Sequence, residues 1–445
     1  MSELLQRGTR ISTKSTNQCI VKRLLGEGGQ GEVYLVSWGG RDFALKWYYA
    51  ASATEMQRRG IEELIKEGKP SDCFLWPEDL AESEDVPGFG YIMGLRPANY
   101  ISLFDFVSGR ESPSALALIH FCIELCKAFR ALHTRGLCYR DISFGNAFFD
   151  PINGNVLICD NDNVATNRSK ITGVLGTPDF MAPEVIRNES LPSTRSDLHS
   201  LAVLLFYTLC IGHPLLGKKA LTIRCFDGPA REKLFGKEPV FIFNEIDTSN
   251  AAVDLSHDPS GEAGGTAMIF WRMYPTVLRA AFNKAFTSGL QDPDYRVTEL
   301  EWLETLSRFR DSYFKCTCGT PNYYDSILFQ GNKYTGRCWH CSRTLELPYR
   351  MRLGNSVVML HAEAKLYSHH LSIGKHFDFS ASVGELVQHP SDPEIWGLKN
   401  LTRARWVATM VDGSVKDVDP GRSVPLAVNT KIDFGKVVGV IEYGS

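Results

Sequence analysis

A glycine-rich segment and a lysine near the start of the chain have the residue types and the spacing needed to hold phosphate groups. Residues 26–33, GEGGQGEV, fit the pattern G-x-G-x-x-G-x-V, in which glycines let backbone N–H groups approach phosphates and the valine covers a base. Residues 43–46, FALK, follow in the place of V-A-I-K, where the ammonium group of Lys46 can hold the α and β phosphates. These two segments predict a nucleotide site.

Two other interpretations of the glycine-rich segment stay open at this point. A dinucleotide site of the Rossmann type requires the glycine loop to begin a helix. Residues 32–38, EVYLVSW, instead alternate apolar and polar positions, which is typical of a strand. A plain glycine-rich turn without a ligand is the other alternative, since a single lysine on a strand is usually only solvated.

Two segments in the middle of the chain carry side chains that can handle protons and metal ions. Residues 138–146, CYRDISFGN, match the pattern H-R-D-L-x-x-x-N at Arg140, Asp141 and Asn146. Residues 156–162, VLICDND, follow as a short apolar strand that ends in a carboxylate, in the place of D-F-G. An aspartate can orient a substrate hydroxyl, and hard Mg²⁺ prefers carboxylate and amide oxygens.

Further motifs follow in a fixed order. Residues 176–184, GTPDFMAPE, look like the end of an activation segment with its A-P-E triplet, and residues 197–201, DLHSL, look like the start of a buried central helix. Arg296 is placed like the arginine that pairs with the glutamate of A-P-E, here Glu184. With these matches the chain resembles, over about residues 18–308, the eukaryotic-type (Hanks-type) serine/threonine protein kinases of bacteria.

This resemblance implies an α+β bilobal protein kinase fold and the transfer of the ATP γ-phosphate to serine or threonine hydroxyls of a protein substrate. Asp141 would serve the acceptor hydroxyl, and Asn146 and Asp160 would hold Mg²⁺. Lys46 would be held by a glutamate of the following helix. We choose Glu63 for that role.

The resemblance also implies the partner of Lys46 and the walls of the nucleotide pocket. Residues 60–67, GIEELIKE, offer three glutamates, and Glu62 is the alternative to Glu63. For Met93, Leu95 and Phe148, ordinary core or strand packing is the alternative to the role given in the next sentence. The implied nucleotide-binding residues are Gly26, Gly28, Gly31, Val33, Ala44, Lys46, Met93 as the gatekeeper, Leu95 on the hinge and Phe148 on the pocket floor.

Four positions depart from the family pattern. Tyr139 replaces the histidine, and Ser143 stands where such kinases usually carry a lysine that contacts phosphate. Loss of that lysine removes positive charge from the γ-phosphate, where electrostatic stabilisation is the main catalytic device. Asn161 cannot pack as the phenylalanine of D-F-G does. We expect Asp162 to cap a turn, with extra metal charge as the alternative.

These departures leave alternative functions open. A pseudokinase scaffold that binds nucleotide and docks protein partners is the main one, and a small-molecule kinase is disfavoured by the A-P-E triplet and by Thr177, which is similar to a threonine of serine/threonine kinases. Arg140 beside the catalytic aspartate suggests an activation loop held by a phosphate, because a guanidinium grips phosphate through two hydrogen bonds. Thr172 is the best placed acceptor, followed by Ser169.

Periodicity indicates the elements that position these residues. Residues 18–50 read as three antiparallel strands, residues 52–68 as a helix and residues 90–95 as a further strand, so a strand-rich lobe precedes a helical one. The apolar run at residues 201–211 reads as a buried helix. Residues 226–266 are rich in glycine, proline and aspartate and read as a long loop.

Two short pairs of cysteines follow the kinase-like region. The first pair is Cys316 and Cys318, and the second is Cys338 and Cys341, with 20 positions from Cys318 to Cys338. Four thiolates on two tight turns suit a tetrahedral Zn²⁺ of structural type. Disulfides are the alternative, although a cytosol keeps thiols reduced. His340 is expected to be a bystander.

The remaining residues alternate as short strands. An Asp412-Gly413 dipeptide between two apolar runs predicts a hairpin. The region faintly resembles a forkhead-associated β sandwich without its phosphothreonine-binding residues, so docking of a protein partner or dimerisation is the expected role. The predicted division is an N-terminal extension (1–17), a kinase domain (18–310, with lobes 18–95 and 96–310), a zinc ribbon (311–350) and an all-β sandwich-like domain (351–445).

Composition limits the remaining function classes. The 445 residues include 48 Lys and Arg against 51 Asp and Glu, so no overall positive field draws the chain to nucleic acid or to an anionic membrane. The apolar run at residues 201–211 is shorter than the roughly 18 to 20 residues that span a bilayer. The first ten residues lack the apolar run of a signal peptide, and we therefore expect a cytoplasmic protein with no membrane or nucleic acid partner.

Overall fold

The structure is a computed structural model that describes residues 3–15, 18–167, 175–371 and 374–443. The chain divides into two compact units. The first comprises residues 1–264 and 284–299, and the second comprises residues 265–283 and 300–445.

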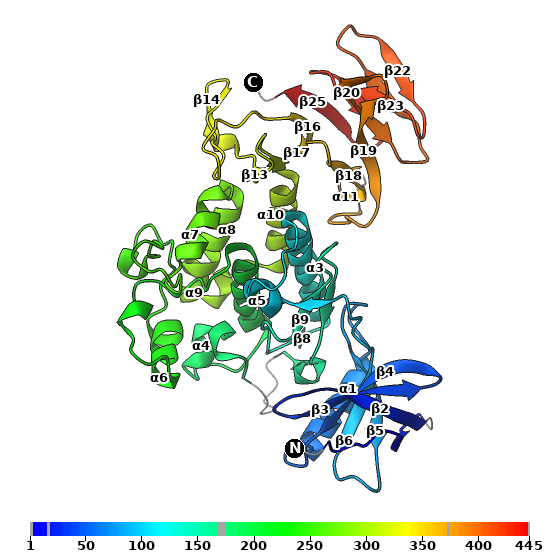
Figure 1. The fold of residues 1–445 in the computed structure, drawn as a ribbon, viewed down its shortest axis with the longest axis vertical. Coiled ribbons are helices and arrows are strands. Elements are labelled where there is room, and N and C mark those ends of the chain that lie inside the picture. The colour runs from blue at the N-terminus through cyan, green and yellow to red at the C-terminus, as the bar shows by residue number, and fades with distance from the viewer. Residues whose placement is uncertain (1–2, 16–17, 168–174, 372–373, 444–445) are drawn as a thin grey trace. The chain divides into compact units, whose positions relative to one another are not determined.

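Six strands near the N-terminus close into a barrel in the order β1-β2-β3-β4-β6-β5 (Figure 1). The expected strands and glycine turn of residues 18–50 are present, but the segment expected as an extension also contributes a strand. In that strand Ile11 and Thr13 are buried, and it pairs with both β2 and β5. The strands are β1 (Arg10–Thr13), β2 (Gln18–Glu27), β3 (Gly31–Trp38), β4 (Arg41–Tyr48), β5 (Pro77–Glu82) and β6 (Phe89–Met93).

One helix, α1 (Glu55–Glu67), follows β4. The Thr54 hydroxyl caps its start by accepting a hydrogen bond from the backbone N–H of Gln57, and acidic and basic residues occupy its first and last turns. Ile61 and Leu64 are its buried residues, and the indole of Trp76 donates to the Leu64 carbonyl at 2.8 Å. This anchoring fixes which face of α1 is turned to the barrel.

The helical part of the first unit is built around α5 (Thr194–Cys210), which is buried on nearly every side and confirms the helix predicted at 201–211 (Figure 1). Ser193 caps its start in a capping box with Ser196. The other helices are α2 (Leu103–Val107), α3 (Ala115–His133), α4 (Pro183–Ile186), α6 (Gly228–Arg231) and α9 (Ser288–Gln291). The short strands are β7 (Ile101–Ser102), β8 (Leu137–Cys138), β9 (Ala147–Phe149), β10 (Val156–Ile158) and β11 (Ala165–Thr166).

Single helical turns make up most of the remaining structure of this unit. The region expected as a long loop, 226–266, contains α6, one π-helical segment and a 3-10 turn. The turns are η1 (Asn161–Asn163), η2 (Pro178–Phe180), η3 (Ala220–Thr222), η4 (Glu232–Lys237, the π-helical segment), η5 (Thr248–Asn250) and η6 (Pro293–Tyr295).

The second unit begins with helices α7 (Gly265–Met273), α8 (Thr276–Phe286, whose last three residues belong to the first unit) and α10 (Glu299–Asp311). Trp302 is fully buried and its ring lies 5.0 Å from that of Phe282. A small region with two hairpins follows. Its elements are β12 (Tyr313–Lys315), β13 (Pro321–Tyr323), η7 (Ser326–Leu328), β14 (Phe329–Gln330) and β15 (Lys333–Tyr334).

The last part of the second unit is a β sandwich, as the sequence predicted. Buried side chains of a six-stranded and a four-stranded sheet form one core, which includes Met351, Leu398, Trp406 and Ile441. Gly413, at φ 81°, turns the predicted hairpin. The first sheet contains β16 (Tyr349–Leu353), β17 (Ser356–Leu360), β21 (Trp406–Thr409), β22 (Val415–Val418), β24 (Lys431–Asp433) and β25 (Val438–Tyr443). The second contains β18 (Lys365–Tyr367), β19 (Ser382–His389), β20 (Asp392–Asn400) and β23 (Ser423–Pro425), and α11 (Ser368–Leu371) follows β18.

In the part of the chain that the structure describes, no helix combines the length and the apolar character needed to cross a membrane.

Candidate active site and metal site

The glycine-rich loop connects two paired antiparallel strands. β2 ends at Glu27 and β3 starts at Gly31, and the backbone N–H of Gly28 donates to the Gly31 carbonyl at 2.9 Å. A Cβ atom at Gly31 would lie 2.1 Å from the Trp47 carbonyl oxygen, so only glycine fits there. Because the loop leads into a strand and not into a helix, the Rossmann interpretation is wrong.

Lys46 lies on β4 with its ammonium group inside the first unit. Its Nζ atom is 2.7 Å from Asp162 Oδ2, 3.4 Å from Asp160 Oδ1 and 3.4 Å from Gln30 Oε1. Burial opposes the charge of Lys46, but the carboxylates of Asp162 and Asp160 outweigh it and raise the pKa of the amine. The amine is therefore a fixed positive charge at neutral pH.

The partner of Lys46 differs from the expectation. The side chain of Glu63 is exposed and lines a cavity of about 270 Å³, and Glu62 pairs with Lys14 at 3.0 Å. Neither is bonded to Lys46. The expectation that Asp162 caps a turn is also wrong, because its side chain is fully buried and accepts from Lys46.

The proposed catalytic aspartate is held from two sides. Thr177 Oγ1 donates to Asp141 Oδ1 at 2.7 Å, and Asn146 Nδ2 donates to Asp141 Oδ2 at 3.1 Å. The carboxylate of Asp197 on α5 accepts from the backbone N–H groups of Tyr139 at 2.5 Å and Arg140 at 3.0 Å. The loop that carries Asp141 is therefore anchored to the central helix.

Asp160 follows a residue that is bonded to the loop carrying Asp141 and Asn146. The backbone N–H of Cys159 donates to the Asn146 carbonyl at 2.9 Å, which ties the two segments together. Asp160 has a φ of 48°, an uncommon conformation for a residue with a side chain, and such conformations cluster at functional sites. Its side chain is 46% exposed, and burial of the rest raises the pKa of the carboxyl group. The Asp160 carboxylate and the Asn146 amide oxygen are ligands that suit Mg²⁺.

Two side chains that depart from the family pattern, Tyr139 and Asn161, form hydrogen bonds to nearby backbone carbonyls. The Tyr139 hydroxyl donates to the carbonyl of Cys159, directly before Asp160. The Asn161 side chain is buried, and its amide donates to the Leu75 carbonyl at 2.9 Å and to the Ile158 carbonyl at 3.0 Å. The segment that carries Asp160 is thereby fixed to its surroundings.

The other residues implied for the nucleotide pocket lie on strands of the barrel, on β9 or just after β6. Ala44 pairs with Met93 across β4 and β6, and both are buried. Phe148 on β9 is half-buried, and the guanidinium of Arg96, beside the half-buried Leu95, lies 4.0 Å from its ring centroid. Val33 pairs with Lys46 across β3 and β4, and Gly26 is exposed at the end of β2.

The predicted pair of Glu184 and Arg296 is confirmed. The guanidinium makes two parallel hydrogen bonds to the carboxylate, Nη1 to Oε1 at 2.9 Å and Nη2 to Oε2 at 2.7 Å. Arg296 also donates to the Arg195 carbonyl at 2.8 Å, so the end of the activation segment is bound to the start of α5.

A comparison with known families agrees with this geometry. Residues 19–234 match the protein kinase domain family. This region is a protein kinase domain.

Similar proteins carry the same domain within longer chains. Serine/threonine-protein kinase sck2 of Schizosaccharomyces pombe is 27% identical over 206 residues, which cover 42% of this chain and 30% of that protein. Cell cycle serine/threonine-protein kinase CDC5/MSD2 of Saccharomyces cerevisiae is 30% identical over 332 residues, covering 70% of this chain and 43% of that protein. Serine/threonine-protein kinase pkn2 of Myxococcus xanthus is 28% identical over 204 residues, covering 42% of this chain and 24% of that protein. The chain thus spans less than half the length of these relatives.

Some residues of the kinase domain site were missed from the sequence. Gln30 lies in the glycine loop, and Tyr48 and Gln57 contact Asp162, the tyrosine through its hydroxyl. Tyr48 could have been found, because it follows Lys46 by two positions on a strand and so shares its face. The predicted phosphate acceptors Thr172 and Ser169 lie outside the described residues.

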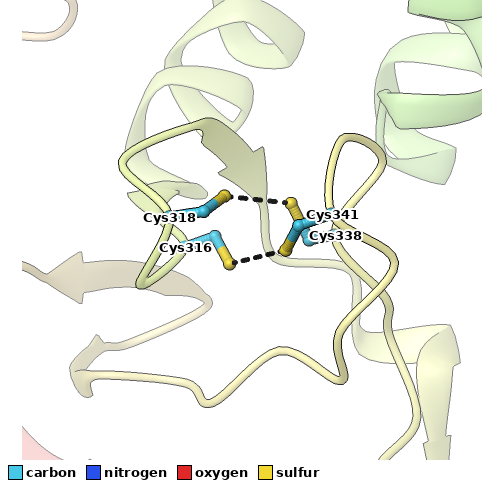
Figure 2. Close-up of side chains that lie close together, drawn as sticks. All are labelled: Cys316, Cys318, Cys338 and Cys341. Carbon is cyan, nitrogen blue, oxygen red and sulfur yellow. Dashed lines mark hydrogen bonds between the residues drawn. The ribbon is translucent and has the colours of Figure 1, made fainter.

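The four cysteines after the kinase domain come together as expected. Figure 2 shows their sulfur atoms pointing toward one another from two loops. Cys316 Sγ lies 3.8 Å from Cys341 Sγ, and Cys318 Sγ lies 3.7 Å from Cys338 Sγ. These distances exclude disulfides, whose sulfurs are about 2 Å apart. They match the edge of about 3.8 Å of a tetrahedron with metal–sulfur bonds of about 2.3 Å.

A second cluster, of Asp311, His369 and His370, is held by hydrogen bonds of a structural kind. The candidate ligand atoms lie within 4.8 Å of one another. However, Nδ1 of His370 accepts from the Tyr367 N–H at 2.8 Å, and Nδ1 of His369 accepts from the Phe377 N–H at 2.9 Å. The protons of both neutral rings are therefore on Nε2, which is the atom a metal would need.

Proposed function

We propose that the chain is an active serine/threonine protein kinase that transfers the γ-phosphoryl group of ATP to serine or threonine hydroxyls of a protein. The observation that carries the proposal is the assembly of Lys46, Asp141, Asn146 and Asp160 in one unit, linked by the hydrogen bonds described above. A pseudokinase scaffold does not need Asp141, because that carboxylate serves the acceptor and not the nucleotide.

Each side chain has a distinct part in the proposed reaction. The backbone of the glycine loop and the Lys46 ammonium would hold the phosphates, and Val33, Ala44, Met93, Leu95 and Phe148 would surround the adenine. Asp141, kept in one orientation by Thr177 and Asn146, would accept a hydrogen bond from the acceptor hydroxyl and align it with the γ-phosphate. Mg²⁺, held by Asn146 and Asp160, would supply positive charge against the phosphate oxygens.

Two features bear on substrate choice and rate. Thr177 bonds directly to Asp141 at 2.7 Å, and this supports a substrate with a serine or threonine hydroxyl. Ser143 is buried and carries no charge, so the γ-phosphate has one cation fewer than in most members of the family. We therefore propose a turnover slower than that of kinases with a lysine at this position.

The decisive experiment measures transfer of radiolabelled phosphate from ATP by the purified chain, followed by mass spectrometry of labelled residues. Label on serine or threonine that disappears in Asp141→Asn supports the proposal. ATP binding without any transfer would instead favour the scaffold. We also propose that Thr172, or else Ser169, is phosphorylated and held by Arg140.

We propose that the four cysteines hold one structural Zn²⁺, and that residues 311–350 form a zinc ribbon. Tetrahedral spacing of the sulfurs supports this assignment, and hydrogen bonding to Thr320 lowers the pKa of the Cys318 thiol, which favours the thiolate form. Four thiolates leave no open position on zinc, so the site would have no catalytic part.

The sandwich at residues 351–445 would dock protein partners, with a forkhead-associated-like arrangement of its two sheets. We place the protein in the cytoplasm, where a reducing environment suits its twelve free cysteines. In this proposal neither a nucleic acid nor a membrane is a partner.

A further inference from the structure

The partner of the phosphate-binding lysine comes from an unusual place in this kinase domain. A buried ammonium group needs an opposite charge nearby, since an uncompensated buried charge is strongly destabilising. The resemblance placed that charge on α1, where Glu63 lines the same cavity as Asp162 but makes no bond to Lys46. The α1 side chain that forms hydrogen bonds at this point is Gln57. Its Nε2 donates to the Tyr48 hydroxyl at 3.1 Å and to the Asp162 carbonyl at 3.5 Å.

Asp162 supplies the charge instead. Its side chain is fully buried, and Oδ2 accepts from Lys46 at 2.7 Å and from the Tyr48 hydroxyl. This contact is shorter than the 3.4 Å between Lys46 and Asp160, whose side chain is 46% exposed. The ion pair with Asp162 is therefore the stronger of the two and the less exposed to solvent.

The residue between the two aspartates holds them in place. Asn161 donates through its amide to the Leu75 and Ile158 carbonyls, at 2.9 and 3.0 Å. These bonds hold the Asn161 side chain against Leu75 and against the end of β10. The proposed metal ligand Asp160 and the lysine partner Asp162 are thus placed by the same three-residue segment.

We propose that Asp162 is a positioning residue that replaces a helix glutamate as the partner of Lys46 and orients the amine for the phosphates of ATP. The inference rests on the proposed kinase function. One consequence is that the negative charge facing Lys46 does not come from α1. Movement of that helix would then act on this site through the hydrogen bonds of Gln57 and not through the charge of a helix glutamate.

The test compares charge removal at Asp162 with charge removal on α1. We expect Asp162→Asn to lower kcat/KM for ATP about 100-fold at saturating Mg²⁺, as loss of a buried electrostatic contact to a catalytic group does. Glu63→Gln should lower kcat/KM for ATP much less. The matched control is Glu55→Gln, an exposed residue of the same helix, which should retain the parent kcat/KM.

Moving the carboxylate from position 162 to α1 distinguishes a positioning role of Asp162 from a role in folding. Adding Gln57→Glu to Asp162→Asn puts a carboxylate on α1 next to Tyr48, and we expect it to recover about 10-fold in kcat/KM. Tyr48→Phe, which removes only one bond to Asp162, should raise KM for ATP several-fold while the melting temperature changes little. If Asp162→Asn fails to fold, Tyr48→Phe still decides the matter, because an unchanged KM for ATP in that variant would contradict the inference.

Three outcomes would overturn the inference: an equal loss in Glu63→Gln and Asp162→Asn, an unchanged Asp162→Asn, or a shifted Mg²⁺ requirement as its sole effect. Failure of the kinase proposal is recognised separately, because the parent chain would then transfer no phosphate. In that case Asp162→Asn should still weaken binding of ATP, measured by calorimetry, by about 10-fold, and undiminished binding would refute the role of Asp162.

Discussion

The carboxylates of the site differ in what surrounds them, and this difference separates their roles. Asp162 is fully buried and serves Lys46, whereas Asp160 is 46% exposed and Asp141 is partly exposed. Exposed carboxylate oxygens can still reach a substrate or a metal ion. Removing one of them should therefore harm the chemistry more than the fold.

We predict that Asp141→Ala and Asp160→Ala each lower kcat at least about 1000-fold, because each removes a group that handles charge in the transition state. Both variants should melt within a few degrees of the parent chain. Asp72→Ala is the control, since its side chain is 96% exposed and pairs with Lys69 on the surface. Phosphate transfer at the parent rate in either active-site variant would contradict the assignment.

The ion pair of Glu184 and Arg296 contributes to the stability of the folded chain. The Arg296 side chain is 2% exposed and that of Glu184 is 14% exposed, so removing one partner leaves a buried charge behind. We predict that Arg296→Ala lowers the free energy of unfolding by about 3 kcal/mol, measured by urea titration. Lys22→Ala breaks a pair whose two side chains are about half exposed and should cost less than about 1 kcal/mol. Equal losses in the two variants would count against this account.

At the scale of elements, the sequence predicted which segments are helices and strands better than it predicted how they face one another. In α1 the glutamates at positions 62 and 63 satisfy the family pattern equally well. The structure turns Ile61 and Leu64 inward instead, because Leu64 is anchored to Trp76, a contact between distant residues that no local pattern records. The four residues of β1 were missed for the same reason, since their pairing with β2 and β5 is tertiary.

Motifs were predicted well where one segment supplies both the residue and its position. The catalytic loop and the cysteine pairs are of this kind. The role of Asp162 could not be predicted, because it depends on Lys46 and Tyr48, more than a hundred residues away in the chain. Burial decides between a turn cap and an ion pair, and burial is a property of the folded unit.

His133 on α3 bonds through its ring to Glu299, the last residue of the first unit, and, at 3.1 Å, to Asp197 on α5. Burial opposes protonation, but the two carboxylates outweigh it and raise the pKa of His133 from 6.5 to about 9. A raised pKa in the folded state contributes stability that is complete below pH 6.5 and is lost as pH rises to about 9.

We therefore predict that the free energy of unfolding falls by about 3 kcal/mol between pH 6.5 and about 9, at about 1.4 kcal/mol per pKa unit. Urea titrations at a series of pH values measure this fall, and His133→Gln should flatten it. His257→Gln is the control, because that residue is exposed and its imidazole bonds to the neighbouring Ser256. A variant at His133 with the same pH slope as the parent would show that the charge lies elsewhere.

At the scale of the whole molecule, the kinase domain and the cysteine site are stabilised by different means. The kinase domain has a large core around α5 and anchors its catalytic loop through Asp197. The region at 311–350 has short hairpins and one helical turn, and the loop between its cysteine pairs is polar and aromatic with few aliphatic residues. Because such a segment has little apolar surface to offset the entropy lost on ordering, we expect the proposed Zn²⁺ to supply the difference.

We predict one Zn²⁺ per chain, measured by elemental analysis, and its loss in Cys338→Ser. Chelation or that variant should speed hydrogen exchange in residues 312–350, because ligation and folding of this region are coupled. ATP binding at Lys46 and Asp160 should persist, since these residues belong to the first unit. Cys225→Ser, which changes an exposed cysteine far from the four in sequence, is the control and should retain the metal. A chain without zinc, or a variant lacking all four thiols that exchanges and melts like the parent, would refute a metal-stabilised region.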